Sequence, residues 1–259
     1  MNPRPLLDQL RWYVAMGADE AIGDRPVDRF VQGDPRPARR TGPPEGLIGS
    51  SVTTPVASPV QLSDSRSLAA QAGSLEELRA AIAAFEGCSL KATATNLVFG
   101  DGNPGARIMF VGEAPGADED RLGKPFVGVS GQLLDRMIGC IGLDRDSAYI
   151  TNILPWRPPG NRQPTASEIA ACLPFVERHI ELVNPSILVL VGGTSAKALL
   201  AANEGIMKLR GRWFMYCSSS RAQPIETMAI FHPAFLLRSP AQKREAWRDL
   251  IAIKSKYQY

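Results

Sequence analysis

A short apolar run at residues 108–111 (Ile-Met-Phe-Val) constrains the fold of this chain more than any other stretch. Successive apolar residues lack the alternation of a half-exposed strand, so they predict a strand buried on both faces, as in a parallel sheet. The run ends at Gly112, and Pro115 and Gly116 follow; such residues break regular structure and let a ligand approach the backbone. Open α/β sheets bind ligands at the carboxyl ends of their strands. We therefore expect part of a ligand site here, with a solvated acidic loop starting at Glu113 as the alternative.

Predicted strands and helices alternate through the rest of the chain. Ser74 and Thr165 each precede a glutamate by three residues, the spacing of a capping box that begins a helix. Strands that alternate with helices predict a mainly parallel α/β sheet covered by helices on both faces. The predicted strands are residues 107–111, 148–153, 186–191, 212–217 and 227–231, and the predicted helices begin near residues 75, 131, 166, 194 and 240.

Composition excludes several classes of protein. A chain of 259 residues with 44% hydrophobic residues can bury a full core in one large or two small domains. The net charge of +3 is too small for the whole surface to attract nucleic acid, so any basic binding region is local. No apolar run approaches the roughly 20 residues of a membrane span, and the N-terminus lacks a signal-peptide pattern. We expect a cytoplasmic protein with reduced cysteines.

The N-terminal part differs from the rest in composition. We expect residues 1–31 to be a helical extension, because apolar residues between positions 5 and 22 predict a short helix. Whether this helix docks on the main domain or on a partner stays open. Residues 32–70 are rich in proline and serine and predict an extended linker. The main domain is then residues 71–259.

Two further predicted strands end in polar side chains. Asn152 closes one strand and His232 directly follows another. Turns after parallel strands share one edge of the sheet, so both side chains are expected to face one pocket. An amide offers an acceptor and a two-proton donor, which suits the edge of a nucleobase, and His232 is placed to donate a proton or a hydrogen bond. A turn residue and a structural histidine are the alternatives, and His179, between charged neighbours in a helix, is expected at the surface.

Other side chains suggest a nucleic-acid surface. Phe126 lies outside any strong periodicity and is either a core residue or a platform on which a base stacks. Residues 158–161 (Pro-Pro-Gly-Asn) are stiff, and with nearby basic side chains they predict a positively charged rim for phosphates. Scattered exposed basic residues are the alternative. The basic residues in predicted loops are Arg157, Arg162, Lys208, Arg210, Arg212 and Arg238.

Six motifs between residues 75 and 255 resemble the uracil-DNA glycosylase superfamily, most closely its family 4. They are Val-Gly-Glu-Ala-Pro-Gly (111–116), Gly-Lys-Pro-Phe-Val-Gly (123–128), Ser-Gly-Gln-Leu-Leu (130–134), Thr-Asn-Ile (151–153), Arg-Pro-Pro-Gly-Asn-Arg (157–162) and His-Pro-Ala-Phe-Leu-Leu-Arg (232–238). The resemblance implies a three-layer αβα fold around a central four-stranded parallel sheet. It also implies that residues 71–259 form a catalytic domain, a monomer without membrane contact, which hydrolyses the N-glycosidic bond of a uracil flipped out of DNA and so starts base-excision repair.

The same resemblance implies three catalytic residues. Glu113 would position or activate water, Asn152 would read the edge of uracil, and His232 would stabilise charge on uracil O2. In the best-known glycosylase family an aspartate stands at the place of Ala114, so the resemblance does not say how water is activated.

Further residues carried over from the family form the pocket and the DNA contacts. Phe126 would stack on uracil, and Glu119 would stand where a bulkier residue blocks the methyl group of thymine in other families. Leu236 would enter the duplex and Arg238 would contact phosphate. The remaining uracil-binding candidates are Gly112, Ala114, Pro115 and Gly116, and the remaining DNA-binding candidates are Arg157, Arg162 and Gly192.

One departure from family 4 concerns its cofactor. Members usually carry a [4Fe–4S] cluster on four cysteines. Cys88 and Cys172 match two of these ligands, but Phe85 and Trp156 stand at the other two positions. Because two thiolates do not hold the usual cluster, we expect neither the cluster nor another metal.

Two alternatives to a glycosylase remain within the same superfamily. A covalent uracil-DNA binder needs a nucleophilic histidine in the loop after the asparagine strand, and residues 157–165 contain none. A non-catalytic nucleic-acid-binding protein would not require all of the candidate site residues, so their joint presence argues against this alternative. This set is Glu113, Phe126, Asn152 and His232.

Overall fold

The computed structural model describes residues 59–218 and 223–257. The helical extension predicted at residues 1–31 and most of the predicted linker lie outside these ranges. Helix α2 (Pro59–Gln71) occupies the end of the stretch expected to be linker, so an extended chain does not continue to residue 70. Proline is tolerated in the first turn of a helix. The helix is stabilised by packing against α6, which buries Ser65 and Ala69, and composition alone does not reveal such packing.

A mixed sheet of six strands forms the centre of the fold, in the order β1-β3-β2-β4-β6-β5. The four central strands are parallel, as the resemblance implied, and the edge strands β1 and β5 are antiparallel to their neighbours. The strands are β1 (Asp101–Gly102), β2 (Ile108–Gly112), β3 (Ala148–Asn152), β4 (Ile187–Val191), β5 (Trp213–Tyr216) and β6 (Ile225–Ile230).

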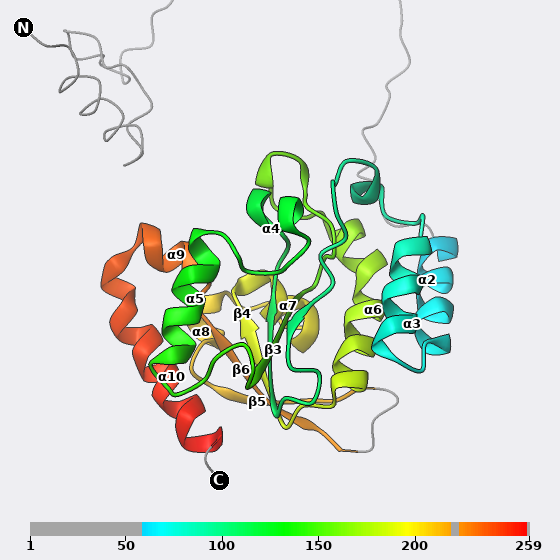
Figure 1. Cartoon of the computed structure of the whole chain (residues 1–259). Helices are drawn as coiled ribbons and strands as arrows, with labels where there is room; N and C mark the ends of the chain where they lie inside the picture. Colours follow the sequence, from blue (N-terminus) through cyan, green and yellow to red (C-terminus); the bar gives the residue numbers. More distant parts are fainter. Residues whose placement is uncertain (1–58, 219–222, 258–259) are drawn as a thin grey trace, which may run out of the picture. The chain divides into compact units, whose positions relative to one another are not determined.

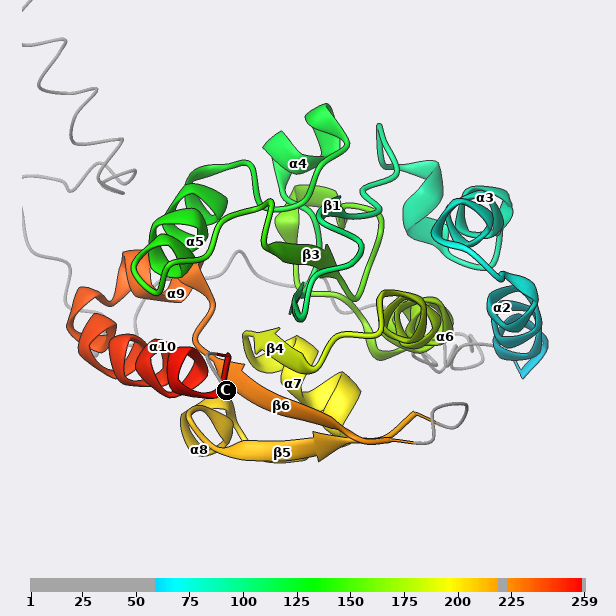
Figure 2. The ribbon, with the colours of Figure 1, turned by 60° about the horizontal axis from the view of Figure 1, so that its bottom comes forward.

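Helices cover both faces of this sheet, which confirms the predicted three layers (Figures 1 and 2). One face carries α5, α9 and α10; the other carries α6 and α7, with α2 and α3 packed on α6. The helices after α2 are α3 (Leu75–Ala84), α4 (Ala117–Leu122), α5 (Val129–Gly139), α6 (Ala166–Val183), α7 (Gly193–Leu200), α8 (Ile206–Leu209), α9 (Pro233–Arg238) and α10 (Lys243–Tyr257). None of the helices in the described ranges is long and apolar enough to cross a membrane.

Strand β2 explains why its sequence is apolar at successive positions. Ile108 and Phe110 pack into the core under α5 and α10, whereas Met109 and Val111 pack into the core under α6. Side chains of a strand alternate between faces, so a strand covered on both faces needs an apolar residue at each position. Burial of these side chains drives the sandwich of sheet and helices.

Helices begin at both predicted capping boxes, but only the box at Thr165 is complete. The Ser74 hydroxyl accepts a hydrogen bond from the Glu77 amide at the start of α3, while the Glu77 carboxylate accepts from the Gly73 amide and not from that of Ser74. At the start of α6, the Thr165 hydroxyl accepts from the Glu168 amide, and the Glu168 carboxylate accepts from the Thr165 amide. These reciprocal bonds satisfy amides that have no partner inside a helix.

His179 was expected at the surface, and this prediction is wrong. The side chain is buried in α6, where Nε2 lies 2.9 Å from the Tyr149 hydroxyl and the ring stacks on Phe99. Burial lowers the pKa of His179 to about 3, so the ring is neutral. The charged residues Arg178 and Glu181 were a poor guide, because residues one and two positions away on a helix point in other directions.

Candidate active site

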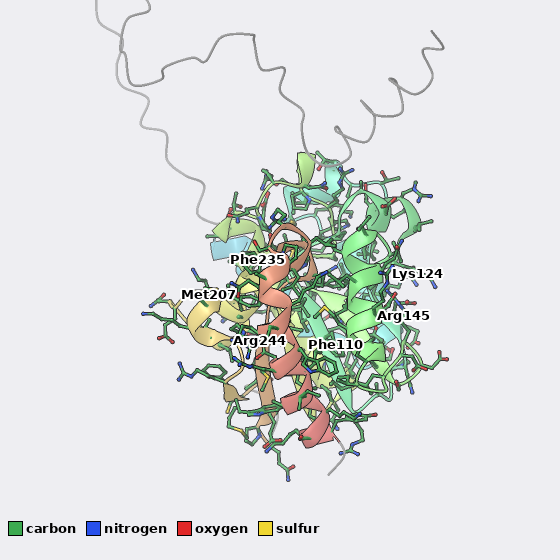
Figure 3. All side chains as sticks on the ribbon, turned by 90° about the vertical axis from the view of Figure 1, so that its left-hand side faces the viewer. Phe110, Lys124, Arg145, Met207, Phe235 and Arg244 are labelled. Carbon is green, nitrogen blue, oxygen red and sulfur yellow. The ribbon has the colours of Figure 1, made fainter. Side chains whose placement is uncertain are left out.

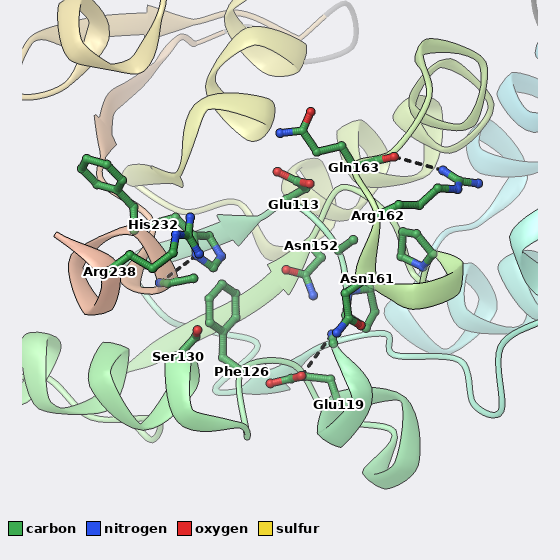
Figure 4. A pocket seen from close by; sticks show the side chains of 16 residues that line it. Glu113, Glu119, Phe126, Ser130, Asn152, Asn161, Arg162, Gln163, His232 and Arg238 are labelled. Carbon is green, nitrogen blue, oxygen red and sulfur yellow. Dashed lines mark hydrogen bonds between the residues drawn. The ribbon is translucent and has the colours of Figure 1, made fainter. Parts of the chain in front are cut away.

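A pocket of about 470 Å³ lies at the carboxyl edge of the parallel sheet (Figure 4). The turns after β2, β3 and β6 meet there, as expected for an α/β sheet. Three residues predicted from three different strands, Glu113, Asn152 and His232, line this one pocket. Its lining is Glu113, Ala114, Pro115, Gly116, Glu119, Phe126, Ser130, Asn152, Pro158, Asn161, Arg162, Gln163, His232, Ala234, Phe235 and Arg238.

Asn152 presents an unpaired acceptor to the pocket. The residue pairs in register with Gly112 at the ends of β3 and β2, and only 6% of it is exposed. Its Oδ1 is the one buried side-chain oxygen or nitrogen in the described ranges without a hydrogen-bond partner. A buried polar atom without a partner costs about 1–3 kcal/mol, so such atoms are rare in folded proteins. A ligand that donates a hydrogen bond to Oδ1 would remove this cost.

Gly112 permits the close approach of the pocket side chains. A Cβ at this position would lie 2.3 Å from Asn152 Oδ1 and 2.5 Å from Phe126 Cζ, shorter than any tolerated contact. Gly192 has a φ of +102°, and a Cβ there would lie 3.2 Å from His232 Cβ, so the glycine also allows the close approach of His232. That Gly192 contacts DNA stays a prediction. Neither glycine lines the pocket itself.

His232 is held as a neutral donor. It caps α9, and its Nδ1 accepts a hydrogen bond from the Ala234 amide at 3.1 Å. The proton of the neutral ring is therefore on Nε2. Burial, and secondarily the positive charge of Arg238, lowers the pKa of His232 to about 4. At neutral pH the ring offers an uncharged N–H donor.

The Glu113 carboxylate is oriented by a neighbour that the sequence analysis missed. The Thr194 hydroxyl donates a hydrogen bond to Glu113 Oε2 at 2.6 Å. Thr194 lies in the first turn of α7, directly after the glycine pair that follows β4. The signal in the sequence was the hydroxyl next to a turn at the ligand-binding edge of the sheet. The bond leaves Oε1 of Glu113 available to the pocket.

Glu119 uses its carboxylate to hold the pocket loop. One oxygen accepts from the Gly116 amide at 3.0 Å, and the other accepts from the amides of Val127 and Gly128 at 2.9 and 2.8 Å. The side chain ties the turn after β2 to the start of α5. That Glu119 stands where a bulkier residue blocks the methyl group of thymine in other families stays a prediction.

Phe126 is both a core residue and a pocket wall, so the two readings of its sequence position are compatible. The residue is 5% exposed and belongs to the cluster under α5 and α10. Its ring lines the pocket with its centroid 5.7 Å from that of His232. A flat apolar wall beside polar groups suits a planar ring with polar edges.

The predicted DNA contacts are only partly gathered at the pocket. Arg238 and Arg162 line it, but Arg162 is also paired with Glu168, with the closer contact at 2.6 Å. Arg157 donates to Asn161 beside the rim. Arg210, expected in the basic rim, is instead paired with Asp249 of α10.

Leu236 is not placed to enter a duplex, so this prediction is wrong. The side chain is 1% exposed, because α9 turns it into the apolar core. The next residue, Leu237, is 41% exposed. Adjacent helical residues point about 100° apart, and the sequence did not reveal which leucine faces the core.

The residues at the position of the family cluster do not fit four-thiolate ligation. Cys88 and Cys172 are buried free thiols in one apolar core cluster. Phe85 and Trp156 belong to the same apolar core cluster, and the Phe85 ring packs edge-on against Phe175. Within the described ranges no group of three or more His, Cys, Asp or Glu side chains is arranged to hold a metal.

The fold and the pocket define an α/β protein with a pocket of polar and aromatic side chains at the carboxyl edge of a parallel sheet. The model of the uracil DNA glycosylase superfamily matches residues 99–251. The chain therefore belongs to this superfamily.

Individual relatives agree with the predicted family 4. The chain is 38% identical to a type-4 uracil-DNA glycosylase of Sulfurisphaera tokodaii over 186 residues, which cover 70% of this chain and 84% of the relative. It is 39% identical to the type-4 enzyme of Archaeoglobus fulgidus, over 68% of this chain and 89% of the relative. A type-4 enzyme of Thermotoga maritima is 40% identical, over 65% and 86%.

Proposed function

We propose that this protein is a uracil-DNA glycosylase that hydrolyses the N-glycosidic bond of deoxyuridine in DNA and so starts base-excision repair. The observation that carries the proposal is the unpaired acceptor of Asn152, which shares a pocket with the neutral N–H donor of His232, in a chain of this superfamily. Uracil supplies the donor and the acceptor that these two groups lack.

Recognition of uracil is proposed to depend on Asn152 and Phe126. Uracil has an N–H at N3 that pairs with Asn152 Oδ1, and a carbonyl at C4 that accepts from the amide nitrogen. Cytosine has an acceptor at N3 and an amine at C4, so it would leave the buried acceptor unpaired and facing a lone pair. Sites that depend on a buried hydrogen bond reject analogues strongly for this reason. Stacking on Phe126 offsets part of the cost of extruding the base.

Bond cleavage is proposed to depend on His232. As the glycosidic bond breaks, negative charge grows on uracil O2 and the sugar becomes an oxocarbenium ion. The Nε2–H donor stabilises that charge, and it is already oriented because Nδ1 is held by the Ala234 amide. A donor that needs no reorganisation during the reaction contributes most to the rate.

Glu113 is the proposed group that orients the attacking water. Its Oε2 is held by Thr194, while Oε1 stays available in the pocket. Ala114 lines the same pocket and provides no carboxylate. An anionic Glu113 would also stabilise the positive charge that develops on the sugar.

We propose further that the protein works as a cytoplasmic monomer without a metal. One chain supplies every side chain of the proposed reaction. Phe85 and Trp156 lie in the same apolar core as Cys88 and Cys172, and their aromatic side chains argue against a [4Fe–4S] cluster. Purified protein is expected to contain no stoichiometric iron and to lack visible absorption; a brown protein with iron would overturn this part of the proposal.

A glycosylase assay tests the function directly. Release of free uracil is expected from U:G, U:A and single-stranded substrates, and thymine is not expected to be released from T:G. Asn152→Ala and His232→Ala are each expected to lower the rate by about 10²- to 10³-fold, because each removes a preorganised polar contact. Full activity in both variants would contradict the assigned roles. A protein–DNA adduct on a denaturing gel would instead favour the covalent binder.

A further inference from the structure

The backbone of Phe126 has a conformation that an aromatic residue rarely adopts. Its φ is +53°, in the left-handed region that disfavours side chains with a Cβ. Such residues persist where the surroundings over-determine them, often at ligand sites. The contacts that hold Phe126 therefore bear on how its ring faces the pocket.

The Arg145 side chain binds the backbone carbonyl groups of this segment. Its guanidinium donates to the Pro125 carbonyl at 3.1 Å and to the Phe126 carbonyl. The same group is paired with Asp101 at 2.7 Å and with Asp135 at 3.0 Å. The planar fork of an arginine matches several fixed acceptors at once, which an ammonium does not. Figure 3 shows Arg145 next to Lys124, which is also paired with Asp101.

Two other contacts fix the same segment. The Glu119 carboxylate accepts hydrogen bonds from the two amides that follow Phe126, and Arg145 donates to the Phe126 carbonyl. Both the N–H and the C=O groups of this segment are therefore bound by side chains. The Phe126 carbonyl also lies directly against α5, where a Cβ at Gly131 would be 1.8 Å from its oxygen. The ring itself ends against Gly112. Neither Arg145 nor Gly131 lines the pocket. Phe126 is the pocket residue that both of them contact directly.

We propose that Arg145 is a positioning residue for uracil excision: it clamps the backbone of Phe126 in the left-handed conformation that holds the ring against the flipped base. The inference rests on the proposed function. Arg145 lies outside the pocket, and its effect on uracil excision is exerted through the ring of Phe126.

The test compares Arg145→Met with Arg178→Met in a single-turnover uracil-release assay. Arg178 is a matched control on α6, because it also makes an ion pair and donates to a backbone carbonyl, with 25% side-chain exposure against 24% for Arg145. Arg145→Met is expected to lower the rate by about 10- to 100-fold, since small misplacements in a site have effects of this size. Arg178→Met is expected to stay within about threefold of the unmodified protein.

A double-mutant cycle separates positioning from a general structural role. If Arg145 acts through the ring, Arg145→Met is expected to change the rate less than about twofold when Phe126 is already Ala. An undiminished loss in the Phe126→Ala background would overturn the proposal. So would a single variant Arg145→Met with the rate of the unmodified protein.

A second pair of variants covers the case in which Arg145→Met does not fold. Gly131→Ala pushes a Cβ against the Phe126 carbonyl, whereas Gly139→Ala in the same helix meets nothing within 4 Å. Gly131→Ala is expected to lose activity like Arg145→Met, and Gly139→Ala is expected to keep it. Equal rates for the two alanine variants would contradict the clamp.

A spectroscopic measurement separates this inference from the proposed function. If the unmodified protein releases no uracil, the proposed function fails. In that case, ¹⁹F NMR of 4-fluorophenylalanine at position 126 still tests whether Arg145→Met alters the environment of the ring.

Discussion

At the scale of single residues, three pocket side chains each have a polar atom that forms no hydrogen bond within the described part of the protein. Asn152 Oδ1 is buried without a donor, and His232 has one ring nitrogen bound to the protein and the other free to donate. Glu113 has one carboxylate oxygen on Thr194 and one available. Each side chain is thus oriented by the protein while keeping one polar atom for a ligand. This arrangement is the preorganisation that the proposed reaction requires.

Thr194 offers a sharp test of the role of Glu113. Thr194→Val keeps the shape of the side chain but removes the donor to Oε2, so the carboxylate loses its fixed orientation. We expect kcat to fall by about 10-fold or more, with little change in KM, because water rather than uracil is misplaced.

The matched control for this prediction is Thr194→Ser, which keeps the hydroxyl and is expected to restore most of the rate. Steady-state kinetics on a single-stranded uracil oligonucleotide measure both variants. A serine variant as slow as the valine variant would show that the hydroxyl is not the relevant group.

At the scale of secondary-structure elements, α9 presents two adjacent leucines in opposite roles. Leu236 is inside the core, whereas Leu237 is exposed and directly precedes Arg238, which lines the pocket. Leu236→Ala is expected to lower the free energy of unfolding by about 2–5 kcal/mol, the usual cost of a cavity in a core. Denaturant unfolding at neutral pH measures this change.

Leu237→Ala is expected to leave the free energy of unfolding within about 0.5 kcal/mol, because exposed side chains contribute little to stability. Its effect should appear in activity. We expect the variant to lose rate on duplex U:A and much less on single-stranded DNA, since only a duplex leaves a gap for an apolar side chain when the base is extruded. Equal losses on the two substrates would count against insertion.

At the scale of the whole molecule, two buried neutral histidines couple stability to pH. The pKa of His179 is lowered to about 3 and that of His232 to about 4, both chiefly by burial. Between pH 6.5 and about 4 the unfolded chain binds protons at both positions and the folded chain does not. Stability therefore rises with pH in this window and is lost as the pH falls, by up to about 3 kcal/mol for each histidine.

Denaturant unfolding at pH 7.5, 5.5 and 4.5 measures this dependence. In His179→Gln one of the two histidine contributions is absent, so the loss between pH 7.5 and 4.5 is expected to be about half that of the unmodified protein. A loss of the same size in both proteins would show that other groups control the acid sensitivity.

The sequence by itself determined the class of fold and the residues that meet at the site. Apolar runs such as residues 108–111 are buried on both faces, and glycine, asparagine and histidine at strand ends share one edge, because local patterns and the geometry of parallel strands require it. The helix starts at Ser74 and Thr165 are likewise local and were predicted correctly, although only Thr165 forms the complete capping box.

Only the tertiary structure decided which way individual side chains face and what holds them. The burial of His179 and Leu236, the bond from Thr194 to Glu113 and the clamp of Arg145 on Phe126 all join residues from different elements. Contacts of this kind depend on packing between distant parts of the chain. No local pattern of residues encodes them, and they set the orientation of the groups on which the proposed chemistry depends.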